Sequence, residues 1–184
     1  VHNWLPFVTG GACEWSENMP ALMTSIQAKI PLIPRGISTS VHRTFIDGFD
    51  SPAGKGGVYI VEWTPPPEEI SEDRYCGIRV PLPPSRSSAV QVQLATTHVH
   101  PQAGEENRCA VIMAGNNDFK VNRRLIPDVV LRKFLAMNSR VLAGKISACL
   151  EDMAGCGYRQ RISTDAQGFY RLVERRAAQS SAGV

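Results

Sequence analysis

The clearest pattern in the chain is a helical one, and it covers residues 127–153. Apolar residues recur there at helical spacing, and at about 100° per residue they fall in one arc. Proline suits the first turn because its missing N–H would have no partner there, so the helix is predicted to begin at Pro127. The arc contains Val130, Leu131, Phe134, Leu135, Met137, Val141, Leu142, Ile146, Cys149 and Met153. Such a wide apolar face predicts a helix that covers a sheet, either as core or as the wall of a ligand cavity.

Upstream of this helix, short segments rich in β-branched and aromatic residues alternate with turn-forming residues, which predicts strands. In the strongest segment, residues 58–64, Tyr59, Val61 and Trp63 share one face. Consecutive strands without an intervening helix predict an antiparallel meander, and a sheet followed by one long helix makes the fold class α+β. The predicted strands are residues 38–49, 58–64, 75–82, 90–100 and 109–114.

The two ends of the chain have weaker patterns. The pair Gly10–Gly11 is expected to interrupt an apolar run near the N-terminus, and residues 21–26 fit either a short helix or a strand. Residues 29–35 contain two prolines and are expected to be extended, as in an edge strand. After the long helix, residues 166–178 are compatible with a second, shorter helix.

Length and charge suggest one domain, residues 1–158, followed by a basic tail, residues 159–184. A chain of 184 residues can bury a core of its own. The net charge of +3 arises in the tail, because basic and acidic residues cancel in the rest of the chain. Such a tail is either a solvated end or a segment that contacts anionic membrane. We expect no nucleic-acid partner.

Cysteine usage indicates a reducing compartment, and we expect a cytoplasmic protein. The five cysteines are odd in number and form no Cys-x-x-Cys pair, which argues for free thiols. No apolar run approaches the roughly 20 residues that a bilayer-spanning helix requires. No signal peptide is visible.

Only one motif suggests covalent chemistry. His98 and His100 lie two residues apart on a predicted strand, so both rings point to one face, and Glu105 follows. This spacing resembles the first motif of the cupins, in which imidazoles and a carboxylate bind a transition metal. No histidine follows His100 to complete the set. We interpret His42 as a surface or network residue. Because no nucleophile motif and no Gly-x-Gly-x-x-Gly turn are present, we expect no enzymatic activity and no cofactor.

The order of segments resembles the second half of a StAR-related lipid-transfer (START) domain. The resemblance covers residues 39–153. It rests on a strand that ends at Trp63, a strand that carries Arg79, the His-x-His strand, and a strand that leads through Asp118 to Ile126-Pro127. In that family an Asp-x-x-Gly-x-Ile-Pro motif occupies the last of these positions. The resemblance implies a helix-grip fold, in which a curved antiparallel sheet wraps around the long C-terminal helix and a lipid lies between them.

The resemblance also implies a binding site for a lipid or another hydrophobic small molecule. Arg79 matches the strand arginine of the family and is the expected polar anchor, with a surface ion pair as the alternative. Two other functions stay open: a cupin-like metal enzyme that uses His98, His100 and Glu105, and a ligand-free helix-grip domain that docks partners through its basic tail. The expected apolar contacts are Val61, Trp63, Leu94 and Met113 from the strands, and Val130, Phe134, Met137 and Val141 from the helix.

Overall fold

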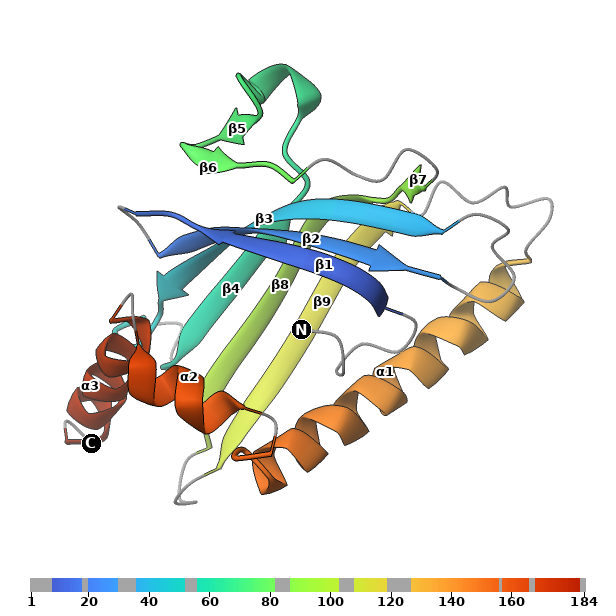
Figure 1. Ribbon diagram of the computed structural model, residues 1–184. Helices are drawn as coiled ribbons and strands as arrows, with labels where there is room; N and C mark the ends of the chain where they lie inside the picture. Colours follow the sequence, from blue (N-terminus) through green and yellow to red (C-terminus); the bar gives the residue numbers. More distant parts are fainter. Residues whose placement is uncertain are drawn as a thin grey trace.

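The protein folds into a curved sheet flanked by helices on one side (Figure 1). The computed structural model describes residues 8–17, 20–29, 36–51, 56–81, 87–102, 108–118, 127–155, 157–165 and 168–182. The strands are β1 (Val8–Trp15), β2 (Ala21–Ala28), β3 (Ile37–Asp47), β4 (Val58–Trp63), β5 (Arg74–Tyr75), β6 (Ile78–Arg79), β7 (Ser88–Ala89), β8 (Gln91–Pro101) and β9 (Cys109–Asp118). The helices are α1 (Asp128–Glu151), α2 (Tyr158–Thr164) and α3 (Phe169–Ala182), with a 3₁₀ turn at Pro67–Glu69.

The main sheet has the strand order β1-β2-β3-β4-β8-β9, and every neighbouring pair along this path is antiparallel. The short strand β7 adds a parallel pairing at the start of β3. Neighbours in this sheet are sequential strands, as short connections favour, except that β4 and β8 are separated in the chain by β5, β6 and β7. The predicted antiparallel meander and the α+β class are confirmed.

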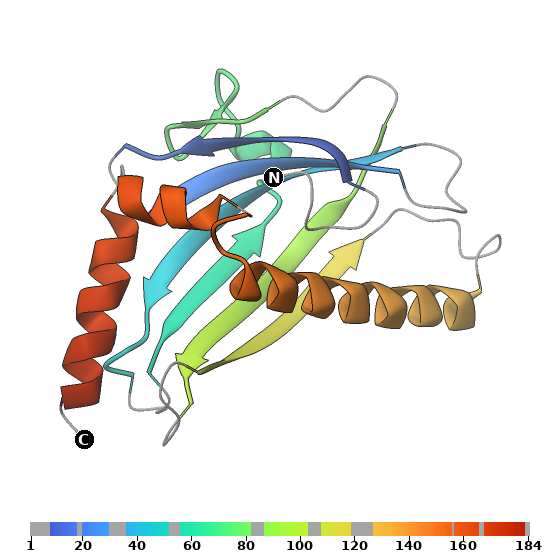
Figure 2. The same cartoon turned by 60° about the horizontal axis from the view of Figure 1, so that its bottom comes forward.

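The sheet has two faces with different coverings. Figures 1 and 2 show all three helices on one side of the sheet and the β5–β6 hairpin on the other. Directly paired residues share a face, so the register assigns each strand position. The row Phe45, Ile60, Thr97, Met113 lies on the helix side, which we call the helix face. Residues His42 and Trp63 lie on the other side, which we call the hairpin face.

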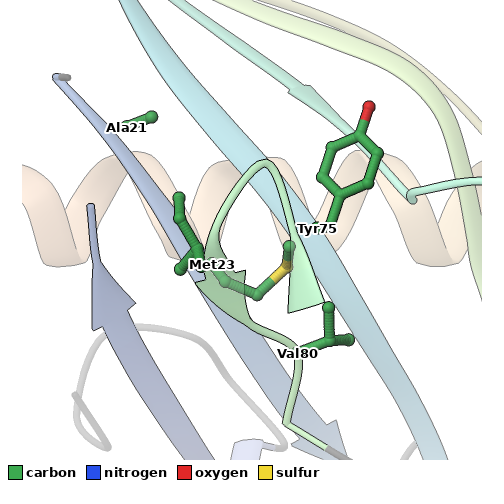
Figure 3. Packing of buried hydrophobic residues seen from close by; sticks show 5 residues of the cluster. Ala21, Met23, Tyr75 and Val80 are labelled. Atoms are coloured by element: carbon green, nitrogen blue, oxygen red, sulfur yellow. The ribbon is translucent and has the colours of Figure 1, made fainter. Parts of the chain in front are cut away.

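A small apolar core lies on the hairpin face, between the sheet and the β5–β6 hairpin (Figure 3). Its centre is Met23, whose side chain is fully buried. The cluster joins strands that are far apart in sequence, because the hairpin is the insertion between β4 and β8. Its members are Ala21, Met23, Tyr75, Ile78 and Val80, with Trp63 and Ile70 packed at its edge.

The structure confirms the strongest sequence predictions. Four of the predicted strands correspond to β3, β4, β8 and β9, and β9 extends beyond the predicted end to Asp118. The long helix begins at Asp128, with Pro127 as its N-cap residue in extended conformation. Residues 21–26 are a strand, and the later helical pattern forms α3, which continues to Ala182. No helix among the described residues is long and apolar enough to cross a membrane.

Two predictions were wrong for local reasons. Residues 75–82 do not form one strand, since Cys76 and Gly77 adopt positive φ angles of 49° and 77° and make the turn of a tight hairpin. Gly10 and Gly11 do not end a strand but lie inside β1. A Cβ on Gly11 would lie 2.7 Å from the carbonyl oxygen of Ser25, so close strand pairing requires glycine there. The expected edge strand at residues 29–35 lies almost wholly outside the described residues.

Most of the predicted basic tail is helical and α3 is attached to the end of β3. The ring of Phe169 lies 4.5 Å from that of Phe45. Arg176 donates to the carboxylates of Asp47, at 2.6 Å, and of Asp50. Partial burial raises the pKa of Asp47, but hydrogen bonds from Arg176 and from the Phe49 N–H outweigh this effect, and the pKa lies below its usual value. The division into a domain and a tail stays a prediction.

The fully buried Met23 should be a main determinant of stability. We expect Met23→Ala to lower the free energy of unfolding by about 2–5 kcal/mol, because it removes apolar contacts and leaves a cavity. Denaturant unfolding followed by circular dichroism measures this. The matched control is Met113→Ala, since Met113 is 56% exposed and its truncation should cost far less. Equal losses in the two variants would contradict this location of the core.

The attachment of α3 should depend on Arg176. We expect Arg176→Met to speed amide hydrogen exchange severalfold in Phe169–Ala182, because Asp47 and Asp50 lose their shared cation. Arg175→Met is the control, since the neighbouring Arg175 is exposed. If exchange in α3 were the same in both variants, the ion pairs would not hold the helix.

Candidate ligand-binding face

The helix face of the sheet and helix α1 both present uncovered apolar side chains. On β9, Met113 is 56% exposed and Val111 is also exposed. On α1, Met137 is 50% exposed, and none of the α1 side chains that the structure describes is fully buried. Exposed methionine and valine side chains on both β9 and α1, which lie on the same side of the sheet, are typical of a site that binds an apolar partner. Figure 2 shows α1 on this side of the sheet, crossing in front of β9.

A polar group lies farther along the same face. The Nε of Arg43 on β3 donates to Oε1 of Glu62 on β4 at 2.6 Å, and these two residues are paired directly across the strands. The pair is partly buried, with side-chain exposures of 31% and 18%. Charge-assisted pairing satisfies the two charges in this partly buried position. The arginine keeps further N–H donors that a polar ligand group could engage.

Two threonine hydroxyls accompany the ion pair. Thr24 on β2 and Thr39 on β3 lie on the helix face by register, and Thr24 is 7% exposed. Within the described part of the chain, the hydroxyl oxygens of both residues are buried without a hydrogen-bond partner. Buried polar groups are normally paired. The Thr24 hydroxyl lies near the Cys13 thiol of the adjacent strand, so the Thr39 hydroxyl is the group available to a ligand with a hydrogen-bonding end.

Aromatic rings close one end of the helix face. Trp15 on β1 stacks on Phe45 with ring centroids 6.1 Å apart. Phe45 in turn contacts Phe169, the first residue of α3. The α3 N-terminal turn is held by Asp165, which accepts hydrogen bonds from the backbone N–H groups of Tyr170 and Arg171. This cluster gives one end of the face a fixed apolar wall.

The sequence-predicted contacts are divided between the two faces. Of the four strand residues, only Met113 lies on the helix face, together with the predicted α1 positions Val130, Met137 and Val141 on that side of the sheet. Val61, Trp63 and Leu94 belong to the hairpin face. The side chain of Phe134 lies outside what the structure describes.

Arg79, the predicted polar anchor, lies on β6 in the hairpin and is exposed. It is therefore on the opposite side of the sheet from the helices. As ligand contacts, Arg79 and the three hairpin-face residues stay predictions that the geometry does not support.

The alternation of residues along a strand does not show which face of the strand meets the helix. A shift of the strand register by one residue exchanges the two faces. The prediction placed Val61 and Trp63, which share one face of β4, against the ligand. The residues that sequence analysis missed, Arg43 and Glu62, occupy the other phase. Their opposite charges were a signal that only the pairing register makes visible.

The predicted metal ligands are only partly assembled. The His98 and His100 rings lie on the hairpin face with centroids 4.8 Å apart. The Nε2 atom of His98 lies 3.1 Å from the Gly56 carbonyl oxygen, and Nδ1 of His100 lies 3.0 Å from that of Pro101. Glu105 is outside the described residues. Within the described residues, no three metal-binding side chains come together.

His42 differs from its predicted role. It is 3% exposed and packs against the rings of Trp63 and Tyr75, with centroids 4.6 and 5.2 Å away. The interpretation as a surface or network residue was wrong, because the β5–β6 hairpin covers this strand position and, among the described residues, neither ring nitrogen has a hydrogen-bond partner. A local sequence pattern carries no signal for a cover formed by a later insertion.

Comparisons with known proteins identify the fold. No protein-family model and no curated protein matches the sequence. The structure is similar to the crystal structure of human STARD10, with a TM-score of 0.58 and 13% identity over 95% of this chain and 60% of that one. It is also similar to the human StarD13 (DLC2) lipid transfer and protein localization domain, with a TM-score of 0.54 and 12% identity over 77% of this chain and 61% of that one.

The similarity to STARD10 covers 95% of this chain, which is more than the segment that resembled the family in sequence. The chain spans about 60% of the length of the matched structures. At such low identity the similarity concerns the fold. The chain has a START-like fold of the α+β class, with an antiparallel sheet followed by a long C-terminal helix.

Proposed function

We propose that the protein binds a lipid or a similar hydrophobic molecule between the helix face of the sheet and α1, as a binding or transfer module without covalent chemistry. The observation that carries the proposal is the uncovered apolar surface on both elements, with Met113 on β9 and Met137 on α1 at least half exposed. Burial of such surface stabilises a complex by about 25 cal/mol per Å². The START-like fold supports it, since one structure with this fold is described as a lipid transfer domain.

The polar groups of the helix face suggest the form of the ligand. Arg43, Glu62 and the hydroxyls of Thr24 and Thr39 lie on β2, β3 and β4, while the exposed apolar residues lie on β9 and α1. A molecule with a long apolar part and one hydrogen-bonding end fits this separation. Ligand sites of this kind combine an apolar lining with a few polar groups that set orientation.

The basic tail supports a second element of the proposal, a transient contact with anionic membrane. Arg159 and Arg175 are exposed on α2 and α3, next to the half-exposed apolar residues Ile162 and Leu172. Basic and apolar side chains together favour the surface of an anionic bilayer. The exposed thiols of Cys13, Cys76 and Cys109 support a reducing, cytosol-like compartment.

Lipid binding should depend on which face of β9 is altered. We expect Met113→Lys to weaken binding of a fluorescently labelled phospholipid at least about tenfold, because a charge would be placed against the apolar ligand. Ile112→Lys is the matched control, because Ile112 is its neighbour in β9, is similarly exposed at 53%, and lies on the hairpin face.

Titration of each purified variant with the labelled phospholipid, followed by fluorescence, measures the effect. Equal binding by both variants would place the ligand elsewhere. If the wild-type protein failed to bind this lipid and no lipid were extracted from the purified protein, the proposed function would be wrong.

Membrane contact should follow the charge of the tail. We expect the double variant Arg159→Gln, Arg175→Gln to bind vesicles of phosphatidylserine and phosphatidylcholine more weakly, by about 1 kcal/mol per basic residue removed. Cosedimentation with the vesicles measures the partition. The control is Arg79→Gln with Arg132→Gln, which removes the same charge outside the tail. Equal weakening in both double variants would indicate a response to net charge alone.

A further inference from the structure

His42 lies under the β5–β6 hairpin (residues 70–80) in an environment that excludes its charged form. The side chain is 3% exposed, and its ring contacts Trp63 on β4 and Tyr75 on β5. Within the described part of the chain, both ring nitrogens are buried and have no hydrogen-bond partner. A neutral imidazole tolerates this apolar surrounding better than an imidazolium, whose two N–H donors would both stay unsatisfied.

In the part of the chain that the structure describes, no charged or titratable group near His42 is placed to stabilise the positive charge of a protonated imidazole. On β2 and β3, its neighbours on the hairpin face are Ala21, Met23, Ser40 and Thr44, all uncharged. From the hairpin, the Tyr75 hydroxyl accepts the indole N–H of Trp63 at 3.1 Å, with the Glu69 carboxylate and the Cys76 thiol near that hydroxyl. On the strands of this face the remaining titratable groups that the structure describes are Tyr59 on β4 and His98 and His100 on β8. The other charged side chains of this side, Glu14, Glu72, Asp73, Arg74 and Arg79, are exposed.

Burial is accordingly the cause that lowers the pKa of His42 below its ordinary value of 6.5. The charged residues Arg43 and Glu62 belong to the opposite face and pair with each other. The sheet itself therefore separates His42 from the nearest ion pair.

The hairpin is not part of the main sheet. Its strands form a two-stranded sheet of their own, separate from the β1–β9 ladder. The segment is inserted between Thr64, whose N–H donates to the Val92 carbonyl, and Pro81, whose carbonyl accepts from the Ser40 hydroxyl. Between these two points, the side chains of Tyr75, Ile78 and Val80 cover the core.

We propose that the β5–β6 hairpin is a cover that acid releases, with His42 as the group that senses the proton. An open hairpin exposes the imidazole, which then binds a proton with its ordinary affinity, whereas the closed hairpin holds it neutral. The closed hairpin therefore has its full stability above about pH 6.5, the pKa of an exposed imidazole. Its stability relative to the open hairpin decreases as the pH falls from there toward the lowered pKa of buried His42. In that interval the open fraction rises by up to about tenfold per pH unit, as one linked proton requires. Opening uncovers Met23 and Trp63.

Hydrogen exchange measured by mass spectrometry between pH 7 and pH 5.5, corrected for intrinsic exchange rates, tests the proposal on the full chain. The carboxylate of Asp47 has a lowered pKa and stays ionised in this interval, so the attachment of α3 does not change. The reporters are the hydrogen-bonded amides of Arg74 and Val80, with the β2–β3 ladder as internal reference. We expect a loss of protection of up to about eightfold in the hairpin relative to the reference, which is the limit for one linked proton over this interval.

Two variants separate His42 from a general acid effect. His42→Leu keeps an apolar side chain of similar size under the hairpin and should abolish the pH dependence. His98→Leu is the matched control, because His98 lies on the same face, stacks on Tyr59 and is outside the hairpin contact, so it should retain the pH dependence. A constant protection ratio in the wild-type protein would overturn the proposal. The proposal would also be wrong if His42→Leu kept the full pH dependence of hairpin protection. It would equally be wrong if the hairpin and the β2–β3 reference lost protection to the same extent.

A direct titration keeps the proposal testable if His42→Leu does not fold. Nuclear magnetic resonance of the wild-type protein follows the imidazole carbon and proton signals of His42 with pH. We expect protonation only below about pH 6.5 and together with loss of the Trp63 and Tyr75 ring contacts. Protonation at or above that pH with these contacts intact would overturn the proposal.

Discussion

Strand pairing across β2, β3 and β4 is the constraint on which the rest of the molecule depends. Because direct partners share a face, the register that pairs His42 with Trp63 also pairs Arg43 with Glu62 on the opposite side. A shift by one residue would bury the ion pair under the hairpin and expose His42 to the helices. The position of the core, of the candidate ligand face and of the acid-sensitive contact all follow from this one register.

The two faces of the sheet are covered to different degrees. On the hairpin face, Met23 is fully buried by the β5–β6 hairpin, although that hairpin is short. On the helix face, Leu22 and Val41 are buried as well, whereas β9 and α1 keep large apolar side chains exposed. Buried apolar side chains therefore lie on both faces, and the proposed ligand surface is confined to the exposed residues of β9 and α1.

The acid-sensitive contact and the proposed ligand face are connected through β3. His42 and Arg43 are consecutive residues, so the hairpin contact and the Arg43–Glu62 pair lie on opposite faces of the same part of β3. At the far end of the same strand, Asp47 holds Arg176 of α3. A single strand thus carries the attachment points of the hairpin, of the polar ligand groups and of the terminal helix.

Local physics in the sequence determined the elements with strong periodicity. The apolar arc predicted α1 to within a residue of its start, and β-branched runs predicted β3, β4, β8 and β9, because these signals depend only on neighbouring residues. The same local signals cannot state which phase of a strand meets a helix, which is why Val61 and Trp63 were assigned to the ligand. They also cannot show that residues 70–80 fold back over His42. Those two facts were decided by tertiary structure, since pairing register and the packing of a distant insertion depend on contacts between segments far apart in the chain.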